Sequence, residues 1–117
     1  MDRQDRRVSR RYSVSIPCKF NSPDEQYQGR LKNLSIDGAF VEADECPAVG
    51  ALGNLSFQSS KRQQLKIAVR VVHKSRLSGR SDEIEGFGLY FVDFHDESLA
   101  RLEDLLKKLA ASQGSET

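Results

Sequence analysis

The sequence predicts a mainly β domain: a small, strongly bent antiparallel sheet or barrel with one helix at its C-terminal end. Six short stretches have the apolar residues, and in part the alternation of apolar and polar positions, that are typical of strands. Turn-forming residues separate these stretches. From Asp96 onward, apolar residues recur every three or four positions, as in an amphipathic helix. With 117 residues, the chain has the usual size of one domain and needs no disulfide or metal to support its core.

The first expected strand, residues 12–20, alternates strictly between apolar and polar side chains. Pro17 cannot donate a backbone hydrogen bond, so we expect an edge position or a bulge there. Cys18 falls on the apolar face and is expected in the core, which argues against a zinc site or a disulfide with the distant Cys46. The apolar face consists of Val14, Ile16, Cys18 and Phe20.

Five further strands and a helix follow. The Asp37-Gly38 pair between the second and third strands predicts a hairpin in which Gly38 adopts positive φ. Asp96 or Asp93 is expected to cap the helix, and Lys107 and Lys108 suit its negative end. The strands are expected at residues 27–34, 39–42, 52–57, 65–73 and 87–92. The helix is expected to bury Leu99, Leu102, Leu105, Leu106 and Leu109.

Polar segments mark the expected domain limits. Residues 1–11 are predicted to be a flexible arginine-rich arm, and residues 12–111 the folded domain. Residues 112–117 are predicted to be a disordered tail, and residues 75–83 a mobile loop. The charged N-terminus and the lack of a long apolar run predict a cytoplasmic protein without membrane insertion.

The arm concentrates four arginines, Arg6, Arg7, Arg10 and Arg11, in six residues without an acid. The guanidinium fork fits phosphate oxygens and the O6/N7 edge of guanine, and arginines four apart could hold one compact anion. A solvated basic arm that contacts nothing specific is the alternative. Because the net charge is only +1, a small anion suits this patch better than a long nucleic acid.

A second polar group lies at the turn after the second strand. Asn33 and Ser35 flank Leu34, so both side chains are expected on one face, where an amide and a hydroxyl could bind the edge of a base. Gly38 would leave room for a ligand. The same residue types are also ordinary turn formers.

No pattern predicts catalysis. His73 has no carboxylate or serine partner that the sequence identifies, and His95 precedes the helix as a turn or capping residue. Metal-site, P-loop and nucleophile-elbow motifs are absent from the sequence. We therefore expect neither an enzyme nor a cofactor.

Together, the two polar groups resemble the PilZ domain family, whose pattern is RxxxR, then a strand, then [DN]xSxxG. Here the motifs are Arg7 with Arg11 and Asn33-x-Ser35-x-x-Gly38, and the likeness continues through residues 86–91 to the closing helix, over roughly residues 3–110. The resemblance implies a six-stranded antiparallel PilZ-type β-barrel with a C-terminal α-helix, which binds the bacterial second messenger cyclic di-GMP.

The resemblance also implies roles for individual residues. Arg7 and Arg11 would bind phosphate and the O6/N7 edge of one guanine, whereas Asn33 and Ser35 would hold the other guanine. Arg6 would serve a second molecule of an intercalated ligand dimer. Asparagine offers one acceptor oxygen where aspartate offers two, which bears on affinity. The implied ligand-binding residues are Arg6, Arg7, Arg10, Arg11, Asn33, Ser35, Asp37 and Gly38.

The resulting functional prediction is a single-domain receptor or adaptor whose arm orders on binding cyclic di-GMP and which signals to an unidentified downstream protein. One alternative is a PilZ-like protein–protein interaction module that does not bind the nucleotide. Another is a barrel that binds single-stranded nucleic acid, which would need aromatic platforms along a basic groove. The six phenylalanines and three tyrosines fall mostly at apolar-face or turn positions, so nucleic acid is disfavoured.

Overall fold

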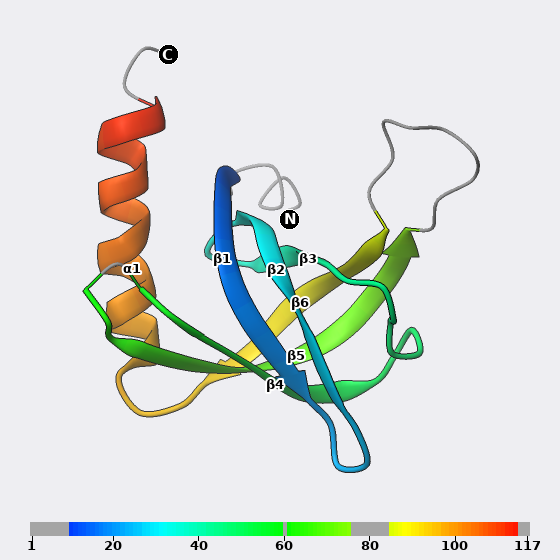
Figure 1. Ribbon diagram of the computed structural model, residues 1–117. Helices are drawn as coiled ribbons and strands as arrows, with labels where there is room; N and C mark the ends of the chain where they lie inside the picture. The colour runs from blue at the N-terminus through cyan, green and yellow to red at the C-terminus, as the bar shows by residue number, and fades with distance from the viewer. Residues whose placement is uncertain (1–9, 60, 76–84, 115–117) are drawn as a thin grey trace, which may run out of the picture.

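A computed structural model describes residues 10–59, 61–75 and 85–114. Six antiparallel strands close into a barrel, and one α-helix packs beside it (Figure 1). The predicted fold class, a mainly β six-stranded barrel with a C-terminal helix, is confirmed. The strands are β1 (Tyr12–Asn21), β2 (Gln26–Leu34), β3 (Gly38–Glu42), β4 (Leu52–Gln58), β5 (Gln64–Ser75) and β6 (Gly86–Phe94).

The strand order around the barrel is β1-β2-β3-β6-β5-β4, and β1 closes the barrel by pairing with β4. That closing ladder runs only from Cys18 to Asn21, so the first half of β1 pairs with β2 alone. The β1–β2 register shifts between Ser13 and Ile16. Pro17 therefore lies beside a bulge and where the ladder to β4 ends, as its missing N–H predicted.

The core lies inside the barrel and is built from the inward residues of every strand. Phe20 of β1 meets Phe87 of β6 edge-to-face, with ring centroids 5.8 Å apart. Tyr27 packs against both rings from β2. Cys18 is only 6% exposed, as the alternation predicted, and burial raises the pKa of its thiol to about 12.

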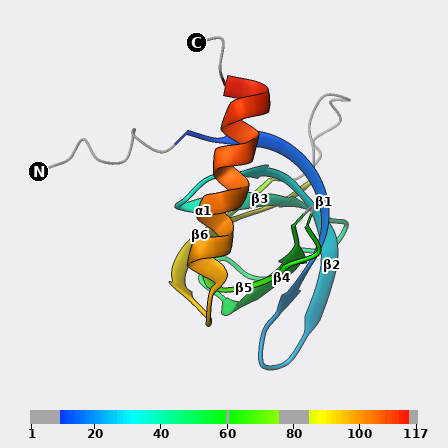
Figure 2. The same cartoon turned by 90° about the vertical axis from the view of Figure 1, so that its left-hand side faces the viewer.

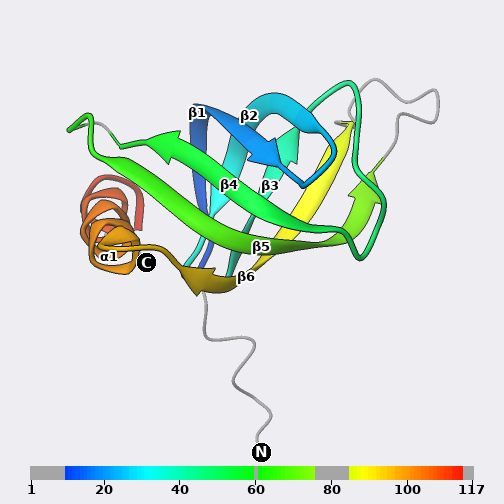
Figure 3. The same cartoon turned by 90° about the horizontal axis from the view of Figure 1, so that it is seen from below.

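The helix α1 (Ser98–Leu109) packs at one side of the barrel, beside the end of β6 and the start of β5 (Figure 3). Leu102 and Leu105 are buried, and Leu106 and Leu109 are partly buried against the core. Leu99 is 40% exposed, so the buried face is narrower than the sequence predicted. No helix in the described ranges is long and apolar enough to cross a membrane.

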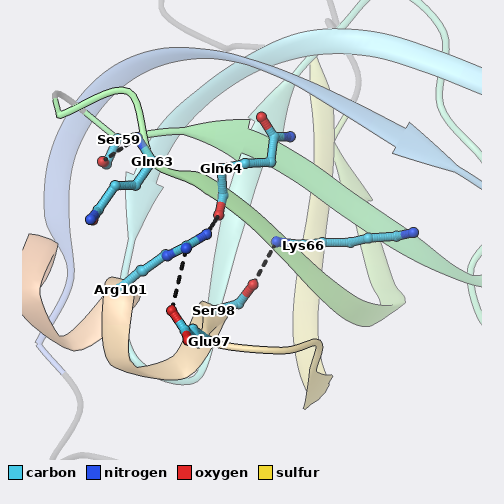
Figure 4. A network of polar contacts seen from close by, with 7 residues as sticks. All are labelled: Ser59, Gln63, Gln64, Lys66, Glu97, Ser98 and Arg101. Carbon is cyan, nitrogen blue, oxygen red and sulfur yellow. Dashed lines mark hydrogen bonds and ion pairs between the residues drawn. The ribbon is translucent and has the colours of Figure 1, made fainter.

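The expected aspartate caps of α1 are wrong. Glu97 occupies the N-cap position without a side-chain capping bond, Asp96 has a positive φ of 51°, and the Asp93 carboxylate accepts the N–H of Phe94. The first turn is instead fastened to β5. Ser98 Oγ accepts the backbone N–H of Lys66 at 2.8 Å, and the Arg101 guanidinium donates to the Gln64 carbonyl at 2.7 Å (Figure 4).

The C-terminal end of the helix is fastened to the start of β1. A short π-helical turn, Ala110–Gly114, extends α1, so residues 112–114 of the predicted tail are helical. The Gln113 amide donates to the Ser13 carbonyl at 2.7 Å and accepts the Ser13 N–H at 3.2 Å. Both ends of the described chain therefore meet at the top of the barrel in Figures 1 and 2. Apart from Arg10, Arg11 and Ser75, the predicted arm and mobile loop lie outside the described residues.

We predict that an alkylating reagent distinguishes the two thiols of the folded protein. Cys46 is partly buried, whereas the pKa of Cys18, raised from 9.0 to about 12, leaves about a thousandfold less thiolate at pH 8 than an ordinary thiol would have. Iodoacetamide should modify Cys46 at least about tenfold faster, as measured by peptide mapping. In denaturant the two rates should converge. Equal rates in the native protein would contradict the burial of Cys18.

Candidate functional site

Arg11 and Asn33, which lie far apart in the sequence, meet at one end of the barrel. The Arg11 guanidinium Nη1 donates a hydrogen bond of 2.7 Å to Asn33 Oδ1. Arg11 immediately precedes β1, Asn33 is the penultimate residue of β2, and Ser13 pairs with Asn33 across the two strands. The first ladder of the barrel therefore brings one residue of each predicted motif into direct contact.

The arginine side of the site is described at two positions. Arg10 is exposed, and its guanidinium carbon lies 6.0 Å from the centre of the Tyr12 ring, at the outer limit of a cation–π contact. Arg11 contacts Asn33. Arg6 and Arg7 lie outside the described residues, so the binding of one compact anion by two arginines four residues apart stays a prediction.

Ser35 differs from its expected orientation. Its side chain is fully buried, and Oγ accepts the N–H groups of Asp37 and Gly38, both at 3.1 Å. The hydroxyl also lies 3.3 Å from the Gly38 carbonyl, to which it donates. Because β2 ends at Leu34, the alternation that placed Ser35 beside Asn33 on an open face no longer applies. In this structure Ser35 fixes the turn that follows Asn33.

A glycine is needed at position 38 because the backbones of β3 and β6 approach closely there. The prediction that Gly38 has a positive φ is wrong. Among the described glycines, only Gly50 has positive φ. A Cβ on Gly38 would lie 2.1 Å from the Leu89 carbonyl oxygen, because β3 begins at Gly38 directly against β6. The backbone of the exposed Asp37 also bonds to β6, since its carbonyl accepts the Phe91 N–H at 2.8 Å. Backbone contacts therefore hold the turn against β6.

The strand register places Asn33 in a row that crosses four strands. Asn33 pairs with Phe40 of β3, Phe40 pairs with Gly88 of β6, and Gly88 pairs with His73 of β5. Residues on either side of Phe40 are buried in the core, so its half-buried ring faces outward. Sequence reasoning missed Phe40 and did not assign His73 to the site, because their proximity depends on a register that joins non-consecutive strands.

A cavity of about 280 Å³ lies over this row. Its lining residues include a guanidinium, an amide and two rings, but no carboxylate. The cavity therefore suits a ligand in which a planar polar group is attached to a negatively charged group. Within the described residues, no cluster of potential ligands could hold a metal ion. The residues that line the cavity are Arg11, Asn33, Ala39, Phe40, Val72, His73, Gly88 and Leu89.

Three larger hollows are weaker candidates. One, of about 540 Å³, lies between β1, β2 and β4, another, of about 390 Å³, lies between β1 and α1, and the third, of about 570 Å³, lies between Tyr12 and α1. The first two are each lined by a single charged side chain, Lys19 and Lys108 respectively, the third is lined by Glu103 and Lys107, and none of the three is lined by an arginine. The smaller cavity at Arg11 therefore has the more specific chemistry.

Several solved structures share this fold. YcgR from Escherichia coli in complex with c-di-GMP has a TM-score of 0.74 at 14% identity, over 95% of this chain and 49% of that one. Bacillus subtilis inhibitor of motility, MotI/DgrA, has a TM-score of 0.72 at 16% identity, over 96% and 53% of the respective chains. The chain thus spans about half the length of these two proteins.

A shorter structure matches over most of both chains. The PilZ domain of E. coli YcgR with c-di-GMP has a TM-score of 0.61 at 16% identity, over 91% of this chain and 90% of that one. No curated protein sequence matches this chain significantly. The family model described as "PilZ domain" matches residues 4–108, a range that contains both sequence motifs and most of α1. The chain belongs to the PilZ domain family.

Proposed function

We propose that this domain is a receptor for cyclic di-GMP that passes the signal to another protein. The observation that carries the proposal is the 2.7 Å contact between Arg11 and Asn33, which joins the two motifs at the edge of one cavity. Support also comes from the family, whose domains are receptor and adaptor modules, and from similar folds that were solved with c-di-GMP bound.

The chemistry of the site suits this ligand. Cyclic di-GMP carries two phosphates and two guanines, so its receptor needs charge-assisted donors for the phosphates and polar partners for the base edges. A guanidinium has five N–H donors, and the contact with Asn33 occupies one of them. Arg11 can therefore keep its position against β2 while it binds a phosphate or the O6/N7 edge of a guanine.

Ser35 and Gly38 support the site in this proposal by shaping the turn. The buried Ser35 hydroxyl holds the N–H groups of Asp37 and Gly38, and this turn follows directly after Asn33 and Leu34. Asn33 would contact a base through its amide, with Asp37 at the exposed rim. Arg7 would approach the same ligand from the arm, and Arg6 and Arg10 would reach a second ligand molecule if an intercalated dimer binds.

Signal output is proposed to involve the arm. Four arginines in six residues repel one another, and the phosphates of the ligand would offset that repulsion. The arm would then fold against the end of the barrel and present a new surface to the downstream protein. Ser13 lies two residues after the last residue of the arm. It bonds to Gln113 and pairs with Asn33, and these contacts hold the chain in place where the arm ends.

Calorimetric titration with cyclic di-GMP tests the proposed site. Arg7→Ala and Arg11→Ala should each weaken binding roughly ten- to a hundredfold, because each removes a charge-assisted contact worth about 1.5–3 kcal/mol. Arg62→Ala is the matched control, since Arg62 is an exposed arginine in the turn between β4 and β5 and should not affect binding. The fitted stoichiometry separates one bound molecule from a dimer.

Two results of this titration would count against the proposal. Binding of the Arg11→Ala protein at wild-type affinity would remove the role of Arg11. No binding by the wild-type protein at about 100 µM ligand would reject the receptor function and favour a PilZ-like interaction module that does not bind the nucleotide.

Hydrogen exchange measured by mass spectrometry tests the ordering of the arm. Saturating cyclic di-GMP should slow exchange in residues 3–12, because amides that fold against the barrel lose access to solvent. The Arg7→Ala protein at the same ligand concentration should show much less protection. Peptides from β4, which lies away from the site, serve as the internal reference. Unchanged exchange in the arm at full saturation would contradict the ordering.

A further inference from the structure

His73 forms one wall of the cavity that contains Arg11 and Asn33, although no sequence motif includes it. It reaches this place through the register: Gly88 of β6 pairs with both Phe40 of β3 and His73 of β5. The site therefore extends from the start of β1 across β2, β3 and β6 to β5.

Gly88 leaves the space that the His73 ring occupies. A Cβ at position 88 would lie 2.2 Å from Nε2, 2.6 Å from Cδ2 and 2.8 Å from Cε1 of His73. Three ring atoms so close to one point mean that the imidazole lies over the backbone of Gly88. Any side chain there would push the ring away, so this glycine positions His73.

Phe40 completes the arrangement from the other side of Gly88. The rings of Phe40 and His73 are nearly parallel, with an interplanar angle of 20° and centroids 6.1 Å apart. Phe40 is half-buried, whereas His73 is exposed. The two rings therefore form an aromatic surface whose outer part, the imidazole, is accessible to a ligand.

We infer that His73 is a base-binding residue of this site and stacks on one purine ring of a guanine nucleotide. The inference rests on the proposed function and deepens it. Bases stack well on aromatic and histidine rings, and the imidazole N–H can also donate to the acceptor edge of guanine. Arg11, on the opposite side of the same cavity, would bind the phosphate or the base edge.

The size of the cavity agrees with this division of roles. About 280 Å³ is just below the usual range for small-molecule sites, so the cavity accommodates one base and not a complete cyclic dinucleotide. The phosphates and the second base would remain at the surface, where Arg11 lines the cavity. His73 and Arg11 would therefore contact different parts of the same ligand.

His95, the other histidine of the chain, provides a matched control. Its Nε2 lies 2.8 Å from Asn54 Oδ1 and its backbone N–H bonds to the Lys66 carbonyl, near the start of α1, and it does not line the cavity. Like His73 it is exposed, so replacing either residue by alanine removes no buried contact area from the core. A difference between the two variants would then report on the cavity itself.

Calorimetry with cyclic di-GMP tests the inference on the full chain. His73→Ala should weaken binding about five- to thirtyfold, since one base–aromatic stack contributes about 1–2 kcal/mol, whereas His95→Ala should bind like the wild type. His73→Phe keeps a ring and should stay within about threefold of the wild type. In NMR spectra, the ligand should shift the Cε1–Hε1 signal of His73 and leave that of His95 in place.

The outcomes separate this inference from the proposed function. If the wild type binds and His73→Ala binds equally well, the role of His73 is overturned and the receptor function stands. A His73→Phe protein as weak as His73→Ala would overturn stacking as the basis of the contact. If the wild type itself does not bind cyclic di-GMP, the proposed function and this inference both fail.

Discussion

The closure of the barrel is the constraint on which the site depends. β1 pairs with β4 only from Cys18 to Asn21, so its first half has a ladder on one side, to β2. The start of β1 is therefore positioned by a few contacts: the pairing of Ser13 with Asn33, the bond from Arg11 to Asn33, and the Gln113 amide on Ser13. A short closing ladder keeps the barrel shut and leaves Arg10 and Arg11 exposed at its end.

These contacts also join the site to the helix. Gln113 bonds to both backbone groups of Ser13, two residues after Arg11, while the other end of α1 is fastened to β5 through Ser98 and Arg101. Under the proposed receptor function, a ligand bound at Arg11 would act on a segment that the helix also holds. These shared contacts would then give ligand binding a physical connection to the helix.

The sequence predicted those features that repeat locally and missed those that depend on strand register. Alternation in β1 identified its core face, and the leucine spacing identified α1. The sequence indicated that position 38 requires glycine, but the expected reason, a positive φ, was wrong. The actual reason is the close contact with Leu89, which depends on the β3–β6 ladder. The resemblance to a family assigned Arg11 and Asn33 to one ligand site, but not the bond between their side chains. His73 carries no local signal, since Gly88 and Phe40 approach it from strands distant in the sequence.

The charge around the site limits the size of the anion that it suits. Asn33 is neutral, so its bond to Arg11 leaves the positive charge of the guanidinium uncompensated, which a carboxylate at that position would not do. Two residues beyond Phe40, however, the exposed Glu42 pairs with Lys32 at 3.8 Å, and the exposed Asp44 follows. A polyanion that continued along β3 would meet these acids, whereas a compact anion held at Arg11 would not. The local distribution of charge therefore agrees with the low net charge of +1, and both favour a compact anion over a nucleic acid.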